Sequence, residues 1–244
     1  MSTLWSYGCS WTYSDIHEKE LGFIFWPELV SKELNLNSIN RAYGGKGISF
    51  STKKLLSDLK DIKKDDIVVF QFSYGDRLEI PHLNKNDHWN GLHITMNKYI
   101  NNKIDVVDDK LMIYMDYVLN YKSEILINEF EYLTLIFDFI EFNIGATVKY
   151  WFIEFSTGVY TKEINYLYKK FYSTRSVQFP NKIKNNNLNL EADKLMEYEQ
   201  IRVSNENYNR PELEWLKTDS HPNQKGQERI SEYILLSLLK KTII

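Results

Sequence analysis

The chain has 244 residues, of which 43% are hydrophobic and 15% aromatic, and a formal net charge of −3. These values exclude an intrinsically disordered chain and suit one domain with elaborations better than two domains. Basic residues occur singly or in pairs, so the sequence has no basic stripe of the kind that binds nucleic acid.

Cysteine content and hydropathy exclude further classes of protein. The only cysteine is Cys9, which rules out an internal disulfide and a cysteine-based zinc site. The amino terminus has no basic segment followed by an apolar run, so we expect a cytoplasmic protein without a signal peptide. Charged residues interrupt the most apolar region, residues 125–142, which falls short of the about 20 apolar residues that a membrane span requires.

The first predicted strand covers residues 3–7 and leads into Gly8-Cys9-Ser10. Because the apolar run ends at a glycine that can turn sharply, Ser10 is expected at the carboxyl end of a buried strand. Ligands of open α/β sheets bind at that edge. A Gly-x-Ser triplet is equally compatible with an ordinary turn, so its meaning depends on what else reaches the edge.

The next predicted elements alternate between helix and strand. Apolar residues at helical spacing predict a helix over residues 23–34, and a continuous apolar run predicts a buried strand over residues 66–72. Between them, in chain order, lie a strand over residues 37–42, the glycine pair Gly44-Gly45, and a helix to about residue 59 that Ser49 or Ser51 caps.

The alternation of predicted helices and strands stops after residue 80. Residues 92–107 suggest a hairpin around Asn101-Asn102, and residues 108–143 suggest a long helix that ends at Gly145. The remaining predicted elements are a strand over residues 147–155, a helix over 163–172, a short strand over 177–179, a polar excursion over 182–211 and a helix over 228–239.

This order of elements predicts an α/β fold, a three-layer α/β/α sandwich around a flavodoxin-like, doubly wound parallel sheet. We expect a single domain over residues 1–244 with a helical and hairpin insertion at about 81–143. With the strand order 2-1-3, the residues Ser10, Gly44-Gly45 and Asp76-Arg77 would meet at the switch point of the sheet.

Asp219 and His221 lie just before the carboxy-terminal helix, where a loop can reach the same edge as Ser10. Acyl transfer needs a nucleophile, a base, a group that orients the base, and N–H donors for an oxyanion. Ser10, His221 and Asp219 supply the first three. No metal or organic cofactor is expected, because the histidines of the insertion are most simply solvated loop residues.

Three blocks of the sequence resemble those of the SGNH (GDSL-type) hydrolases. Gly8-Cys9-Ser10-Trp11-Thr12 is similar to the Gly-Asp-Ser block, with cysteine in place of aspartate. Asn40-Arg41-Ala42-Tyr43-Gly44-Gly45 is similar to the second block, which implies that the backbone N–H of Gly45 binds the oxyanion. Asp219-Ser220-His221-Pro222-Asn223 is similar to the last block, which holds the family's catalytic acid and base.

The sequence departs from the family at two places. The third block normally reads Gly-x-Asn-Asp, whereas Ser73-Tyr74-Gly75-Asp76 lacks the asparagine that donates to the oxyanion. Arg77 follows directly and is a candidate substitute donor, or it pairs with a nearby carboxylate and holds the turn. The acid also lies two residues before His221 rather than three.

The resemblance implies a serine esterase or deacylase that hydrolyses a small acyl ester, such as an O-acetyl group on a carbohydrate. Two alternatives stay open from the same residues: a catalytically weak SGNH-like domain that binds a glycan or a protein, and an O-acyltransferase. A flavodoxin-like nucleotide binder would need a longer phosphate loop than Gly8-Cys9-Ser10 provides.

Overall fold

A four-stranded parallel sheet forms the centre of the fold. The computed structural model describes residues 1–13, 18, 22–73, 77–80, 92–95, 124, 127–152, 175, 222 and 224–239. Its sheet contains β1 (Thr3–Tyr7), β2 (Asn37–Asn40), β3 (Ile67–Phe72) and β6 (Thr147–Phe152) in the order β2-β1-β3-β6. All three neighbouring pairs are parallel. The predicted 2-1-3 order is therefore confirmed, and the carboxyl ends of these strands share one edge.

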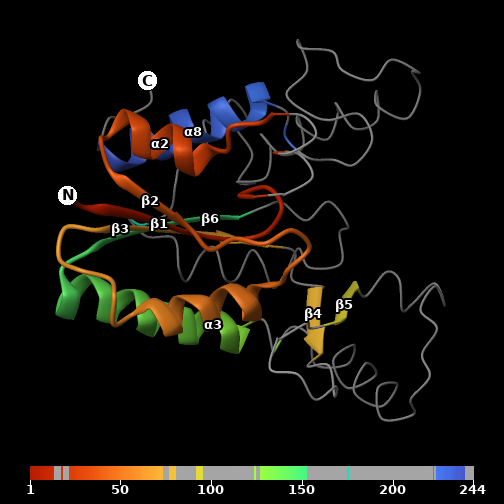
Figure 1. Ribbon diagram of the computed structural model, residues 1–244. Coiled ribbons are helices and arrows are strands. Elements are labelled where there is room, and N and C mark those ends of the chain that lie inside the picture. The colour runs from red at the N-terminus through yellow and green to blue at the C-terminus, as the bar shows by residue number, and fades with distance from the viewer. Residues whose placement is uncertain are drawn as a thin grey trace, which may run out of the picture.

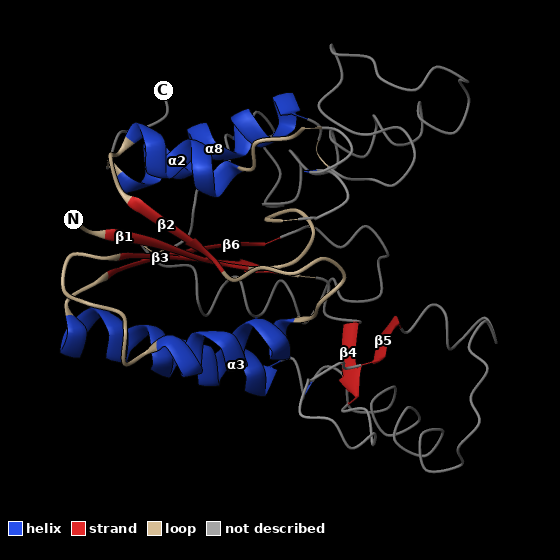
Figure 2. Cartoon of the chain, in the orientation of Figure 1, coloured by secondary structure: helices blue, strands red, loops and turns tan. Residues whose placement is uncertain are grey.

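Helices cover both faces of the sheet, as the three-layer prediction requires. The helices α2 (Trp26–Glu33) and α8 (Gln224–Leu238) lie together on one face, whereas α3 (Ile48–Asp58) covers the other (Figures 1 and 2). Beside α3 runs a helix over residues 127–139, which continues as the π-helical turn η1 (Ile140–Ile144). None of the described helices is both long and apolar enough to cross a membrane.

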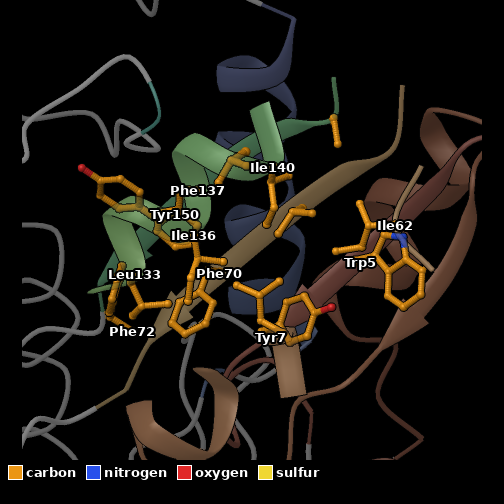
Figure 3. Close-up of a cluster of buried hydrophobic side chains, with 14 of the residues drawn as sticks. Trp5, Tyr7, Ile62, Phe70, Phe72, Leu133, Ile136, Phe137, Ile140 and Tyr150 are labelled. Carbon is orange, nitrogen blue, oxygen red and sulfur yellow. The ribbon is translucent and has the colours of Figure 1, made fainter. Parts of the chain in front are cut away.

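The side chains of β1 alternate between the two layers, as the period of a strand requires. Leu4 packs with residues of α2 and α8, and Tyr7 packs with residues of α3 and of the helix over residues 127–139. Aromatic rings dominate the cluster that contains Tyr7. The Phe70 and Phe72 centroids lie 4.9 Å apart (Figure 3). The Phe130 ring stacks on that of Phe72 with a centroid distance of 4.5 Å. Burial of each such ring contributes about 1.5–3 kcal/mol.

Arg41, just after β2, forms an ion pair that joins three elements. Its guanidinium donates to both carboxylate oxygens of Asp58 in α3, at 3.0 and 3.1 Å. The Tyr7 hydroxyl of β1 donates to the same carboxylate at 3.2 Å. Burial, together with the negative charge of Asp58, raises the pKa of Tyr7 above its ordinary value, so this phenol stays protonated and acts as a donor.

Glycine ends the long helix, as predicted. Gly145 follows η1 with φ +82°, a left-handed conformation that glycine adopts without a steric penalty, and its N–H donates to the Ile140 carbonyl at 3.0 Å. The expected cap of α3 was wrong. The helix begins at Ile48 with Gly47 at the cap position, so Ser49 and Ser51 both lie inside its first turns, and the Ser51 hydroxyl donates to the Gly8 carbonyl at 3.4 Å.

A small second sheet follows β3. The strands β4 (Arg77–Ile80) and β5 (Leu92–Thr95) pair antiparallel, with Arg77 opposite Thr95, and β4 lies near α3. Arg77 therefore opens a strand, and Asp76 lies outside the described residues. Residues 92–95, expected to begin a hairpin around Asn101-Asn102, pair backwards along the chain, and Asn101-Asn102 lies outside the described residues.

The carboxy-terminal helix is present, whereas several other predicted elements lie outside the described residues. The helix α8 begins at Gln224, four residues earlier than expected. The predicted helix over 163–172, the strand over 177–179 and the excursion over 182–211 lie outside the described residues. Most of the insertion at 81–143 is outside them as well, so the single-domain organisation stays a prediction.

Candidate functional site

The turn after β1 carries Ser10. The N–H groups of Thr12 and Tyr13 both donate to the Cys9 carbonyl, at 2.9 and 3.1 Å, which closes a tight turn around Ser10 and Trp11. Ser10 is 7% exposed, so its hydroxyl is nearly buried at the carboxyl edge of the sheet. Cys9 is fully buried, and its Sγ lies 3.9 Å from Ser10 Oγ.

Gln71 of β3 holds this turn from beneath. Its side-chain Oε1 accepts the Cys9 N–H at 3.1 Å and the Thr12 hydroxyl at 2.6 Å, and its Nε2 lies 3.5 Å from Cys9 Sγ. The Trp26 indole N–H of α2 in turn donates to Thr12 Oγ1 at 3.3 Å. Because these groups are buried, each bond removes a polar atom that would otherwise be unpaired.

Gly8 lets the turn approach Gln71. A Cβ at this position would lie 2.4 Å from Gln71 Oε1 and 2.6 Å from Thr12 Oγ1. Such distances are shorter than any allowed contact, so a side chain at position 8 would force the amide and the hydroxyl apart. The glycine of the Gly-Cys-Ser block is therefore required by a close approach rather than by its backbone angles.

The Gly44-Gly45 turn lies directly beside Ser10. The Lys46 N–H donates to the Tyr43 carbonyl at 3.2 Å, and Gly45 has φ +78°, the pattern of a type II turn with glycine at its third position. A Cβ added to Gly44 would lie 3.8 Å from the Ser10 Cβ, so the turn runs next to Ser10 with room for no more than a small side chain between them.

Asn40 fastens these two turns to each other. Its side-chain Nδ2 donates to the Thr12 carbonyl at 3.1 Å, and its Oδ1 accepts the Ala42 N–H at 3.1 Å. The Tyr43 N–H also donates to the Gly8 carbonyl at 3.3 Å. The asparagine that begins the second block thus holds the end of β2 against the end of β1.

The helix α8 is anchored to the same place. The Gln227 side chain is fully buried; its Nε2 donates to the Trp11 carbonyl at 3.2 Å, and its Oε1 accepts the Trp26 N–H at 3.1 Å. Gln224, one turn earlier, accepts the Ile24 N–H at 2.9 Å. The first turns of α8 therefore contact the residue that follows Ser10 in the chain.

The remaining predicted site residues are less fully described. Asp219, His221 and the side chain of Arg77 lie outside the described residues. Ser73, which follows β3 and stands where the family's third block begins with glycine, is 1% exposed, and its hydroxyl has no hydrogen-bond partner within the described part of the chain. The structure thus brings Ser10 and the Gly44-Gly45 turn together, and the roles of the other residues stay predictions.

A half-buried carboxyl lies near the start of α3. Glu129, in the helix over residues 127–139, accepts a hydrogen bond from the Ser49 hydroxyl at 3.4 Å. Burial raises the pKa of the Glu129 carboxyl above its ordinary value, although the bond from Ser49 and the positive charge of Lys53 act in the opposite direction.

Sequence reasoning missed the residues that hold the site. Gln71, Gln227 and Asn40 bind the backbone around Ser10, yet none of them was singled out as a functional residue. Gln71 offered one signal, since it is the only polar residue in the run from Ile67 to Phe72. A buried amide in a central strand must find hydrogen-bond partners, and the nearest strand end is that of β1.

Only solved structures, and no family model or curated protein, are similar to this chain. No protein-family model matches the chain, and no curated protein is similar enough to it to count as a relative. Among solved structures, a Bacillus subtilis protein matches 98% of this chain at 14% identity with a TM-score of 0.50, and the chain spans 56% of that protein's length.

Two further solved structures have lower TM-scores. A putative lipolytic protein of the G-D-S-L family from Desulfitobacterium hafniense DCB-2 matches 97% of this chain and 99% of its own length, at 12% identity with a TM-score of 0.45. A carbohydrate esterase matches 99% of this chain and 69% of its own length, at 14% identity with a TM-score of 0.42.

Proposed function

We propose that the chain is a serine esterase or deacylase of the SGNH type. Ser10 Oγ attacks the carbonyl carbon of an acyl ester while His221 takes the hydroxyl proton, and Asp219 orients the imidazole. The backbone N–H groups of Ser10 and Gly45 bind the oxyanion, and Arg77 is the candidate for a third donor. The substrate class is a small acyl ester, such as an O-acetyl group on a carbohydrate.

The proposed reaction has two steps, the acylation of Ser10 and its deacylation. The tetrahedral intermediate collapses with cleavage of the ester C–O bond, and the alcohol leaves with the proton that His221 holds. Water then attacks the acyl group on Ser10 and gives its proton to His221, after which the acid leaves and Ser10 recovers its proton. If a second hydroxyl replaces this water, the same site acts as an O-acyltransferase.

The observation that carries the proposal is the position of the Gly44-Gly45 turn next to Ser10. Ser10 follows the first strand, the left-handed Gly45 belongs to a turn whose Tyr43 N–H binds the Gly8 carbonyl, and a Cβ added to Gly44 would meet the Ser10 Cβ at 3.8 Å. This arrangement suits a nucleophile and its oxyanion donors. The position of His221 in the sequence supports its role as the base. Position 221 is three residues before Gln224, and Gln227 bonds to the carbonyl of Trp11, the residue after Ser10.

A fluorophosphonate probe tests the proposal, because only an activated serine reacts with it. We expect the wild-type chain to be labelled and the Ser10→Ala variant not to be. Cys9→Ala is the matched control, since it removes the neighbouring buried thiol and leaves the hydroxyl in place. Labelling that persists in Ser10→Ala would exclude Ser10 as the nucleophile.

The missing block-three asparagine favours a second candidate, a catalytically weak domain that binds a glycan or a protein. The same labelling experiment separates the two functions. A folded wild-type chain whose Ser10 does not react with the probe would support the binding domain over the esterase.

A further inference from the structure

The Gln71 side chain connects the two sides of the turn that carries Ser10. Gln71 is fully buried in β3, the strand that lies between β1 and β6. Its Oε1 accepts the Cys9 N–H at 3.1 Å, one residue before Ser10, and the Thr12 hydroxyl at 2.6 Å, two residues after it. One oxygen atom therefore binds the chain both before and after the proposed nucleophile.

The peptide group between Cys9 and Ser10 carries an N–H that the proposed mechanism assigns to the oxyanion. The carbonyl of this peptide group accepts the N–H groups of Thr12 and Tyr13, at 2.9 and 3.1 Å. Because a peptide group is planar and trans, its C=O and its N–H point in opposite directions. The direction of the Ser10 N–H is therefore set by the direction of the Cys9 carbonyl.

The preceding peptide group, between Gly8 and Cys9, is also held by hydrogen bonds. The Gly8 carbonyl accepts the Tyr43 N–H at 3.3 Å and the Ser51 hydroxyl at 3.4 Å. The N–H of the same peptide group is the one that donates to Gln71. Both peptide groups that flank the Cys9 Cα are thus fixed, and the N–H end of the first one depends on Gln71.

The Gln71 amide is itself held in one orientation. Its Nε2 lies 3.5 Å from Cys9 Sγ, whereas both of the donors described above bind Oε1. The Trp26 indole N–H donates to Thr12 Oγ1 at 3.3 Å, so the Thr12 hydroxyl hydrogen is left to bind Gln71. A Cβ added to Gly8 would lie 2.4 Å from Gln71 Oε1, so the amide and the turn pack without space between them.

From these contacts we infer that Gln71 is a positioning residue of the esterase. It acts through Cys9 and Thr12, and directs the Ser10 N–H to the place where the oxyanion forms. An oxyanion donor binds the transition state more strongly than the ground state, so its alignment affects kcat more than KM. The inference rests on the proposed esterase function and adds a residue that acts on the site from within the sheet.

Two substitutions of Gln71 test the inference. Gln71→Met removes the acceptor and keeps the length of the side chain. We expect its kcat for p-nitrophenyl acetate to fall about 10- to 100-fold, because acylation and deacylation both pass through an oxyanion, while KM changes less than about threefold. Gln71→Glu should keep kcat within about fivefold of the wild type, because a carboxyl group in either protonation state retains an oxygen that accepts the Cys9 N–H and the Thr12 hydroxyl.

Asp66→Ala is the matched control for a loss of stability. Asp66 directly precedes β3, at the amino edge of the sheet, and is 4% exposed. Its carboxylate accepts the N–H groups of Thr3 and Lys63, at 2.8 and 3.0 Å, and the Trp5 indole N–H at 3.0 Å. We expect Asp66→Ala to lower the urea midpoint at least as much as Gln71→Met does, and to leave kcat within about twofold of the wild type.

Three results would overturn the inference. They are an unchanged kcat in Gln71→Met, a kcat in Gln71→Glu as low as in Gln71→Met, and a fall in kcat of the same size in Asp66→Ala. If Gln71→Met does not fold, Thr12→Val takes its place, because it removes one of the two donors to Gln71 Oε1 and keeps the shape of the side chain. We expect it to lower kcat about two- to tenfold, and an unchanged kcat would count against the inference.

Amide hydrogen exchange separates this inference from the proposed function. Exchange of the Cys9 N–H, followed by NMR, should be about 10- to 100-fold faster in Gln71→Met than the change in global stability accounts for, and in Asp66→Ala it should follow global stability. If the wild-type chain hydrolyses no ester, the esterase function fails, yet faster exchange in Gln71→Met would still support Gln71 as the residue that holds the turn. Exchange that follows global stability in both variants would overturn the inference, whether or not the chain is an esterase.

Discussion

Gln227 in the last helix donates a hydrogen bond to the backbone carbonyl of Trp11, and so links the end of the chain to the turn that carries Ser10. The same side chain accepts the Trp26 N–H, so one buried amide satisfies two backbone groups from two different elements. The arrangement of α8 relative to the Ser10 turn therefore depends on this residue more than on any other described contact between them.

Replacement of Gln227 by leucine should destabilise the chain. The change leaves the Trp11 carbonyl and the Trp26 N–H buried without a partner, which costs about 1–3 kcal/mol for each group. Urea unfolding of both variants measures the loss, with Gln224→Ala as the control. Gln224 is half-buried and its bond to Ile24 is exposed to solvent, so its loss should cost under about 1 kcal/mol. Equal losses in the two variants would contradict the anchoring role.

Two glycine-to-alanine changes should differ sharply in their effect on stability. In Gly8→Ala the new methyl group would lie 2.4 Å from Gln71 Oε1, so the Gln71 bonds to the turn must break or shift. We expect a loss of about 2–4 kcal/mol, because overpacking and unpaired polar groups add. In Gly44→Ala the nearest atom is 3.8 Å away and φ is not left-handed, so stability should change little. Thermal unfolding compares the two.

The pH dependence of stability should report on Glu129. Because the pKa of this carboxyl is raised in the folded state, the folded chain binds more protons than the unfolded chain once the pH rises above about 4.5. Stability conferred by the neutral form is therefore complete at low pH and is lost as the pH rises through the folded pKa.

Glu129→Gln keeps an acceptor for Ser49 and removes the ionisation. We expect this variant to melt at a higher temperature than the wild type near pH 7, and the difference to vanish near pH 4. Melting temperatures measured across this range decide the matter. A lower melting temperature for Glu129→Gln at neutral pH would mean that the attraction of Lys53 outweighs the cost of burial.

Asp219→Asn tests the proposed orientation of His221. If the carboxylate holds the imidazole tautomer, hydrolysis of p-nitrophenyl acetate should fall severely; the same change has cost about 10⁴-fold in a serine protease. The melting temperature should stay close to that of the wild type. A small loss of activity would instead indicate that a backbone carbonyl orients His221.

Arg77→Ala tests the proposed third oxyanion donor. Loss of one such donor costs roughly 10²–10³-fold in turnover, so we expect a fall in that range with little change in KM. The backbone of Arg77 pairs with Thr95 at the start of β4, which gives the residue a structural role to exclude. Normal turnover together with a lower melting temperature would assign Arg77 to structure alone.

The sequence predicts those features that depend on local patterns. The apolar run from Ile67 to Phe72 reads as a strand buried on both faces, and Gly145 reads as a helix end, because each signal lies within a few residues. The order of the strands follows from the alternation of helices and strands, and with it the meeting of Ser10 and the Gly44-Gly45 turn.

Features that depend on distant partners could not be predicted. Gln71 bonds to Cys9, 62 positions away, and Gln227 bonds to Trp11, 216 positions away, so neither sequence neighbourhood reveals the contact. The strand β4 exists because it pairs with β5, which no pattern around Arg77 indicates. Ser49 or Ser51 was expected to cap α3, but the helix begins at Ile48, before both serines, and the Ser51 hydroxyl donates to the Gly8 carbonyl, 43 positions away.

The burial of Cys9 also provides a natural reporter. It is the chain's single thiol, it is fully buried, and it lies between the Ser10 hydroxyl and the Gln71 amide. An alkylating reagent can reach its sulfur only when the turn opens or the chain unfolds. The rate at which the native chain is alkylated therefore measures how often the turn around Ser10 comes apart, with no label added and no residue changed.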